Sequence, residues 1–221
     1  LSMVLADAGQ VLPFDPPRFA GLGTLGGAVA AGLSGPARPW FGSVRDAVLG
    51  VEIVNGLGER LTFGGQVLKN VAGYDVSRLM VGSFGTLGLI LQVSVRVQPV
   101  PETVMTLAGA YSSDEAARLV RLILSQPLPV SATCYVDGVL RVRLSGSSEG
   151  VQQALDELTL DIEAYDDAFF AKLRDHDHSF FTSSTEPLWR ISLPRGSAFD
   201  EPDALIEWAG ACVWWRADVD A

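Results

Sequence analysis

The sequence predicts an α+β protein in which a strand-rich first half is followed by a smaller unit of mixed helices and strands. Glycine is concentrated in the first half, where 16 of the 23 glycines lie between Gly21 and Gly88. Charge divides similarly: residues 1–100 hold six acids and seven bases, whereas residues 101–221 hold 20 acids and nine bases. We therefore expect two domains, 1–100 and 101–221.

Strands dominate the expected first domain. The segment 48–63, VLGVEIVNGLGERLTF, predicts two strands around a turn at Asn55–Gly58, and 87–97, LGLILQVSVRV, predicts a third. The small-residue segment AVAAGL, which follows the pair Gly26-Gly27, predicts the start of a short helix. The stretch 34–39, SGPARP, predicts a loop because of its glycine and prolines.

Helices and strands alternate in the expected second domain. Apolar spacing and capping residues predict helices at 114–126 and 148–159, and the alternating segment 133–146 with its DG turn predicts a hairpin or a long kinked strand. Beyond these, we expect a strand at 160–165, a helix at 166–181, a strand at 188–194, a helix at 203–210 and a strand at 211–217.

Composition excludes several classes of function. The net charge of −10 lies in the second half, which argues against binding to nucleic acids or anionic membranes, since both require clustered cations. No apolar run approaches the roughly 20 residues that span a bilayer. Cys134 and Cys212 predict two buried thiols and no disulfide framework, so a cytoplasmic location is expected.

Side-chain catalysis and metal binding have little support in the sequence. His176 and His178 lie in an expected helix, where a spacing of two places them on different faces, so they predict a solvated acidic helix end and no metal site. No serine stands in a nucleophile elbow, and no paired histidine and carboxylate indicate a general base. We therefore assign no catalytic residues.

Two glycine segments are the strongest functional signal. GLGTLGG, at Gly21–Gly27, matches the GxGxxG pattern of dinucleotide-binding turns, and GSFGTLG follows at Gly82–Gly88. A Rossmann turn requires a buried strand before its first glycine, but residues 11–20 contain three prolines. The pattern therefore predicts a different use of glycine, in which the bare backbone approaches a ligand directly.

Four motifs in order carry a resemblance to a known family. TLGGAVAAGLSGP, GSVRDAVLGVEIVNGLGE, KNVAGYDVSRL and GSFGTLGLI resemble the vanillyl-alcohol-oxidase or PCMH-type FAD-binding flavoproteins, and most of all the FAD-binding E subunits of bacterial glycolate oxidases. The resemblance implies that residues 1–100 are the second lobe of the FAD-binding domain. It implies that residues 101–221 are a small, incomplete cap-like domain.

The resemblance also implies a cofactor and its site. Bound FAD, held without a covalent bond, is expected at Thr24, Gly26, Gly27, Ala30, Ser34, Gly35, Gly42, Gly85, Thr86, Gly88 and Ile90. Main-chain donors and glycine surfaces would hold the ring and the diphosphate. In that family a separate first lobe also cradles the pyrophosphate. We therefore expect this chain to be a fragment or shortened form lacking that lobe, and to bind FAD weakly or not at all alone.

The implied function is that of an oxidoreductase subunit acting on CH–OH groups. The family oxidises glycolate or another 2-hydroxy acid through the flavin and passes electrons to an acceptor other than oxygen. Implied partners are a homologous flavoprotein subunit and an iron–sulfur subunit, which could hold the protein at the inner face of the membrane. Two alternatives remain: a non-catalytic assembly module without FAD, and an FAD-dependent oxidase of another hydroxy acid or alcohol.

Overall fold

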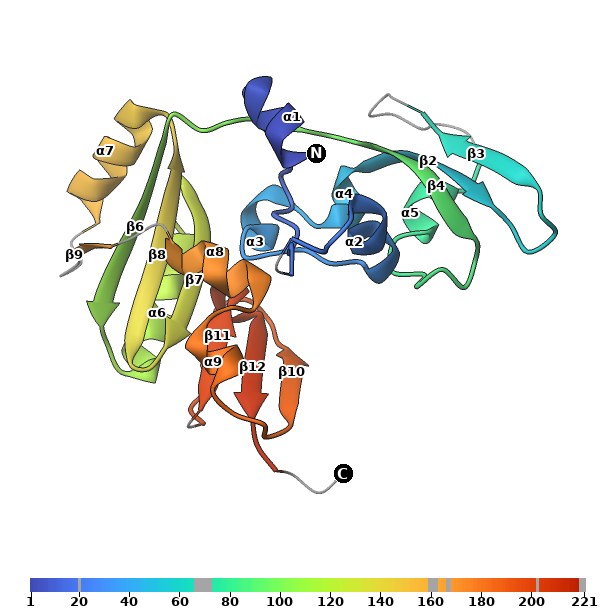
Figure 1. Cartoon of the computed structure of the whole chain (residues 1–221). Helices are drawn as coiled ribbons and strands as arrows, with labels where there is room; N and C mark the ends of the chain where they lie inside the picture. Colours follow the sequence, from blue (N-terminus) through green and yellow to red (C-terminus); the bar gives the residue numbers. More distant parts are fainter. Residues whose placement is uncertain (20, 66–72, 159–162, 166–167, 202, 219–221) are drawn as a thin grey trace. The chain divides into compact units, whose positions relative to one another are not determined.

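The computed structural model describes residues 1–19, 21–65, 73–158, 163–165, 168–201 and 203–218. The chain forms two compact units, unit 1 at Leu1–Val100 and unit 2 at Pro101–Ala221 (Figure 1). Every strand pair in the described part of the chain is antiparallel, with helices between the strands. The expected α+β class is confirmed.

Unit 1 is built on a three-stranded sheet ordered β3-β2-β4, with a separate two-stranded pair β1-β5. Its elements, in chain order, are α1 (Ser2–Asp7), β1 (Gln10–Val11), α2 (Leu25–Ala31), α3 (Arg38–Phe41), α4 (Val44–Ala47), β2 (Val48–Val54), β3 (Arg60–Gly64), α5 (Val76–Leu79), β4 (Leu89–Val95) and β5 (Gln98–Pro99). The three predicted strands are present. The predicted loop at 34–39 is shorter than expected because α3 begins at Arg38.

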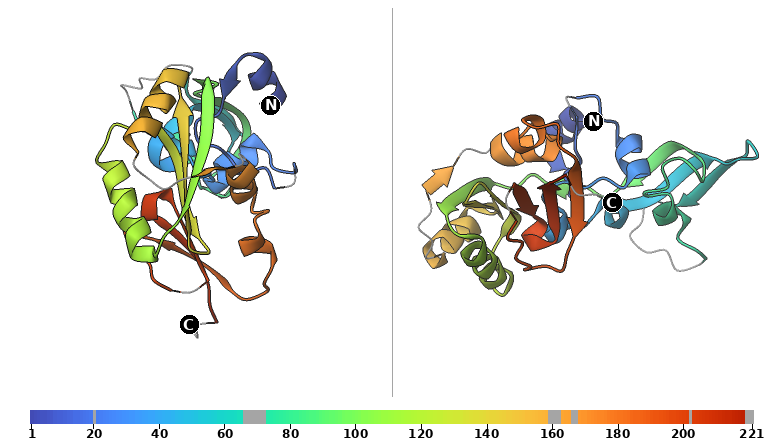
Figure 2. Two further views of the ribbon diagram at one scale, coloured as in Figure 1. Left: turned by 90° about the vertical axis from the view of Figure 1, so that its left-hand side faces the viewer. Right: turned by 90° about the horizontal axis from the view of Figure 1, so that it is seen from below.

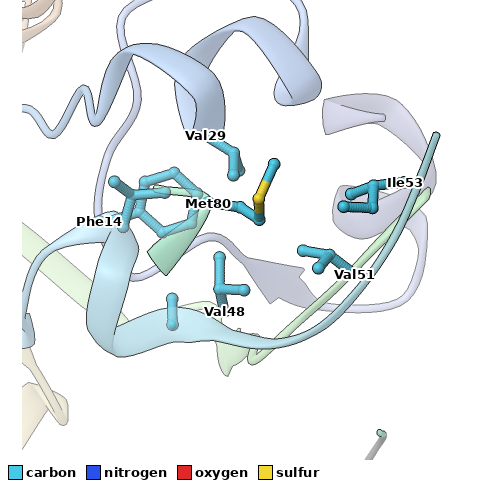
Figure 3. Close-up of a cluster of buried hydrophobic side chains, with 8 residues drawn as sticks. Phe14, Val29, Val48, Val51, Ile53 and Met80 are labelled. Carbon is cyan, nitrogen blue, oxygen red and sulfur yellow. The ribbon is translucent and has the colours of Figure 1, made fainter. Parts of the chain in front are cut away.

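The core of unit 1 lies between this sheet and the helices. Figure 3 shows Val51 and Ile53 of β2 facing Val29 of α2 and Met80, with Phe14 and Val48 beside them. All six side chains are at most 4% exposed. Burial of this apolar surface fixes α2 against the sheet, and α2 carries the first glycine segment.

Unit 2 is built on a seven-stranded sheet ordered β10-β12-β11-β7-β8-β6-β9. Its elements are β6 (Thr103–Ala110), α6 (Ser113–Leu124), β7 (Val130–Val136), β8 (Val139–Gly146), α7 (Ser148–Glu157), β9 (Glu163–Tyr165), α8 (Ala168–Asp175), α9 (Ser179–Thr182), β10 (Leu188–Ser192), β11 (Ala204–Glu207), the 3-10 turn η1 (Trp208–Gly210) and β12 (Cys212–Arg216).

Helices cover both faces of this sheet. α6 and α7 lie on one face and α8 on the other (Figures 1 and 2). Cys134 and Val136 of β7 pack in one cluster with Phe169 and Phe170 of α8. Because side chains alternate along a strand, Thr133 and Tyr135 face the α6 side. Strands β7 and β8 pair antiparallel, so the predicted hairpin is confirmed, and the predicted helices are present as α6 and α7.

Two helix predictions in unit 2 are wrong. Residues 203–210 form strand β11 and turn η1, because Ile206 and Glu207 pair with β7 and Trp208 and Ala209 have φ of +57° and +56°. The expected helix at 166–181 is divided into α8 and α9 at His176, where φ is +59°. A left-handed residue cannot continue a right-handed helix.

The two histidines also differ from the expectation of a solvated helix end. The His176 ring stacks on Phe181, with 4.3 Å between centroids, and His178 Nδ1 accepts a hydrogen bond from the Phe180 amide at 3.2 Å. Both residues are half-buried. Burial lowers the pKa of each ring, and nearby arginines lower it further. Both histidines therefore pack against residues of α9 at the point where α8 ends.

Candidate functional site

Backbone hydrogen bonds join the end of α2, just after the first glycine segment, to the second glycine segment. The Gly82 amide donates to the Val29 carbonyl at 3.0 Å, and the Phe84 amide donates to the Ala30 carbonyl at 2.8 Å. A Cβ added to Gly32 would stand 3.3 Å from the Gly82 Cα, so the two backbones are in contact. The structure therefore brings the end of α2, with Ala30, against the turn that contains Gly85 and Thr86.

The first segment begins α2 with a side-chain cap. Thr24 Oγ1 accepts a hydrogen bond from the Gly27 amide at 3.0 Å, which stabilises the first turn. The Gly27 amide, which was expected to face a ligand, therefore has a partner within the chain. Gly26 has no atom within 4 Å of where a Cβ would stand, so its backbone surface is open.

The second segment forms a tight turn. The amide and the hydroxyl of Thr86 both donate to the Ser83 carbonyl, at 3.0 and 2.6 Å. Gly85 has φ of +75° and open space around its Cβ position, which explains the glycine at this turn. Ser83 Oγ is buried and has no hydrogen-bond partner among the described residues. A buried hydroxyl without a partner costs free energy unless a ligand or water satisfies it.

Gly88 and Ile90 continue the second segment into β4. A Cβ on Gly88 would lie 2.8 Å from the Val54 carbonyl oxygen, so this glycine is required for contact with β2. Ile90 pairs with Ile53 and its side chain packs against the core of unit 1. In the described sheet β4 is an edge strand, so part of its backbone faces away from β2, as pairing with an adenine ring would require.

Ser34, Gly35 and Gly42 form a second group around the start of α4. Ser34 Oγ accepts from the Val44 amide at 2.9 Å, and the Gly35 amide donates to the Phe14 carbonyl at 2.9 Å. Gly42 has φ of +91°, and an added Cβ would lie 3.2 Å from Asp46 Cβ. These contacts explain the three residues within the fold itself; a role toward a ligand stays a prediction.

Two acidic residues beside these segments are committed to helix caps. Asp46 Oδ2 accepts from both the amide and the hydroxyl of Ser43 at 2.8 Å, and these bonds hold the Asp46 pKa below its usual range, helped by the positive charges of Arg78 and Arg38. Asp75 caps α5 and forms an ion pair with Arg78, with 3.2 Å between Asp75 Oδ2 and Arg78 Nε. Lys69 and Asn70 lie outside the described residues.

The open surfaces at Gly26 and Gly85, with the buried Ser83 hydroxyl between α2 and β4, fit a ligand held by backbone and hydroxyl groups. Sequence reasoning missed Ser83, although it stands inside GSFGTLG. Its two neighbours Gly82 and Phe84 bond to α2, about 50 positions away, so no local signal could have identified it. A cavity of about 620 Å³ lies elsewhere, in unit 2, and none of the predicted site residues lines it.

No described helix is long and apolar enough to cross a membrane. Among the described residues, no group of three or more His, Cys, Asp or Glu side chains is placed to hold a metal ion.

Comparisons with known proteins show what the chain is similar to. Residues 1–76 match the family model described as FAD binding domain. The chain is 46% identical over its whole length to the glycolate oxidase subunit GlcE of Escherichia coli (strain K12), of which it covers 63%. It is 35% identical over 62% of its length to the glycolate oxidase subunit GlcD of Bacillus subtilis (strain 168), of which it covers 30%.

A solved structure shares the fold. Alkyldihydroxyacetonephosphate synthase superposes on 96% of this chain with a TM-score of 0.64 and 16% identity, and the match covers 54% of the synthase chain. The chain thus spans less than two thirds of the length of each of these relatives. Sequence and family model agree: residues 1–76 match an FAD-binding domain, and along its whole length the chain is similar to the glycolate oxidase subunit GlcE.

Proposed function

We propose that the protein is an FAD-binding subunit of a complex that oxidises glycolate, or a closely related 2-hydroxy acid, and passes the electrons to an acceptor other than oxygen, such as a quinone. The observation that carries this proposal is the 46% identity to GlcE along the entire chain. We also propose that unit 1 is the second lobe of an FAD-binding domain and unit 2 a cap-like domain.

The residues of unit 1 would bind and orient the cofactor. Bound FAD supplies the two-electron chemistry that oxidation of an alcohol requires. Gly26 and Gly85 offer bare backbone, and Ser83 Oγ offers a buried hydroxyl that lacks a described partner. Thr24 keeps the start of α2 in place, and the edge of β4 offers backbone groups to an adenine ring. No side chain of this chain is assigned a proton-transfer step.

Partner subunits complete the proposed enzyme. The curated relatives GlcE and GlcD are both named as subunits of glycolate oxidase, which supports an assembly of several chains. We infer a flavoprotein partner similar to GlcD, an iron–sulfur partner, and a cytoplasmic location in which these partners hold the complex at the inner face of the membrane.

A titration with FAD tests the cofactor site. The purified chain is titrated with FAD while flavin fluorescence and the visible flavin absorbance are followed, and weak but saturable binding at tens of micromolar is expected, about −6 kcal/mol. Gly26→Val fills the open surface at the first segment and should weaken binding at least tenfold. Because no atom lies within 4 Å of the Gly26 Cβ position, the variant should remain folded.

Gly56→Val is the matched control. Gly56 also has open space at its Cβ position, but it lies in the β2–β3 turn, outside both glycine segments. FAD affinity should be unchanged in this variant. Equal affinity of the Gly26→Val variant and the wild type would show that the cofactor does not lie on the first segment.

A non-catalytic assembly module is the second candidate. It is favoured by the internal hydrogen bonds of the Gly27 amide, Ser34 and Gly35, which leave fewer groups for a ligand. Reconstitution with the partner subunits separates the two functions: glycolate should bleach the bound flavin if this chain is part of an enzyme. Bleaching by a different hydroxy acid or an alcohol, and not by glycolate, would reassign the substrate.

A further inference from the structure

A short helix in unit 2, α9, depends on a histidine for its first turn. Its N-cap residue is His178, and His178 Nδ1 accepts a hydrogen bond from the Phe180 amide at 3.2 Å. A helix of four residues makes too few internal hydrogen bonds to persist by itself. α9, which follows the break after α8 (Figure 1), therefore stays formed because groups outside it hold it in place.

Strand β12 supplies a second set of these groups. Arg216 Nε donates to the Phe180 carbonyl at 2.9 Å, and Arg216 Nη2 donates to the Phe181 carbonyl at 2.8 Å. The side chains of Phe180 and Phe181 pack, together with Trp214 of β12, against the buried cluster that contains Phe170. The carbonyls and side chains of α9 are thus held by β12 and the core, whereas the Phe180 amide is held by His178.

The hydrogen bond at the start of α9 requires a neutral imidazole. A ring nitrogen accepts a hydrogen bond only while it carries no proton, and both nitrogens of an imidazolium are donors. Protonation of His178 at Nδ1 would therefore set two N–H groups against each other and leave the Phe180 amide without its cap. Loss of a cap weakens the first turn of a helix.

The surroundings of His178 disfavour its charged form. Burial lowers the pKa of the ring most, and the positive charge of Arg141 on β8 lowers it further. Asp137 in the β7–β8 turn raises this pKa, and Lys172 of α8 lowers it. Arg216 of β12 adds another positive charge beside α9. A proton on His178 would therefore join a group of cations that outnumbers the nearby carboxylate.

The aromatic ring beside His178 offers little compensation. His178 stands edge-on to Phe169, with 5.1 Å between the ring centres. The central carbon of the Arg141 guanidinium lies 4.3 Å from the centre of the same phenyl ring. The attraction of that ring for a cation is thus already used by Arg141.

We propose that His178 is a pH-sensitive switch: on taking up a proton it ceases to cap α9, and the segment 179–183 opens away from β12. Ser179, Phe180 and Ser183 line the cavity of about 620 Å³ in unit 2, so this movement opens one wall of the cavity. The switch goes beyond the proposed function, because it lies within unit 2 and requires neither a flavin nor a partner chain.

Acid favours the open form because the ring binds a proton more readily there. Once α9 opens, the ring regains its ordinary pKa of 6.5, whereas its pKa in the closed form is lower. The closed form is therefore fully favoured above pH 6.5 and loses stability as the pH falls toward the lower pKa. By this linkage the ratio of open to closed molecules rises up to about tenfold between about pH 7.5 and about pH 5.5.

Amide hydrogen exchange of the full chain, followed by mass spectrometry, tests the switch. Exchange is measured at about pH 7.5 and about pH 5.5 and corrected for the intrinsic pH dependence of amide exchange. Protection of residues 179–183 should fall about five- to tenfold at the lower pH, by the same linkage. Protection of α6, which contains no histidine, should stay the same. Unchanged protection of 179–183, or an equal loss in α6, would overturn the proposal.

Three variants separate the cap from other effects of acid. His178→Asn keeps an acceptor at the cap and cannot titrate, so the segment should stay protected at both pH values. His178→Ala has neither property and should leave the segment equally exposed at both. His176→Asn is the matched control: it removes the neighbouring histidine, and asparagine tolerates the φ of +59° at this position. The pH response of the wild type should remain in this variant.

The variants decide the proposal together with an NMR titration. A wild-type pH response in His178→Asn, or loss of the response in His176→Asn, would contradict the switch. If His178→Ala does not fold, His178→Asn decides. The Cε1–H signal of His178 should titrate with a midpoint below 6.5 in the wild type. A midpoint at or above 6.5 would show that the closed form does not exclude the proton, and would overturn the proposal.

Discussion

At the scale of single residues, the motifs indicated which glycines are needed. They did not indicate the structural reason why each position requires glycine. Gly26 and Gly85 have open space around their Cβ positions, whereas Gly88 is required because a Cβ would meet Val54. The motif letters are the same in both cases. What differs is the distance to a strand elsewhere in the chain, and that distance is set by tertiary packing.

The capping carboxylate Asp46 gives a prediction at this scale. Hydrogen bonds from Ser43 favour its charged form, so its pKa in the folded chain lies below the ordinary value of 3.8. Its stabilising effect is therefore complete above that value and is lost as the pH falls through the lower folded pKa. A carboxyl-detected NMR titration should place the Asp46 midpoint below 3.8 and move it upward in Ser43→Ala. A wild-type midpoint at or above 3.8 would contradict the capping box.

At the scale of elements, the sequence predicted correctly those strands and helices whose formation depends on residues close to them in the chain. The turn at Asn55–Gly58 and the amphipathic helix α6 are examples, and both are confirmed. Strand β11 was misread as a helix because Ala204, Leu205 and Glu207 are good helix formers. Pairing with β7 and β12 outweighs that preference, and neither partner is adjacent in sequence.

Strand order also determines what the two cysteines can do. Both are free and buried, as the sequence predicted. Cys134 of β7 and Cys212 of β12 each pair with Glu207 of the strand between them, so they stand two strand spacings apart, roughly 9.6 Å. A disulfide requires Cα atoms within about 7 Å. Burial raises the pKa of Cys212 to about 12 and that of Cys134 well above its usual value.

We therefore expect the native thiols to be unreactive. A chromogenic thiol reagent at about pH 8 should label neither cysteine of the folded chain within minutes and both after denaturation, because the thiolate is the reactive form. Mild oxidation should produce no internal disulfide. Rapid labelling of one thiol in the native protein would show that the sheet opens near β11.

At the scale of the whole molecule, unit 1 and unit 2 each contain a core of their own, around Met80 and around Phe170 respectively. We expect chains cut between Val100 and Pro101 to fold separately. Each half should show a cooperative thermal transition and dispersed amide NMR signals. A half that remains unfolded alone but folds when mixed with the other would show that its stability depends on contacts between the units.

The bonds between α2 and the turn after α5 also bear on the order in which this protein forms. α2 has seven residues, too few for an isolated helix to persist in water. Its carbonyls at Val29 and Ala30 receive their partners from Gly82 and Phe84, residues that leave the ribosome more than 50 positions later. During synthesis, the first glycine segment therefore stays unformed until the second emerges, and the surface proposed to hold FAD appears in a single step.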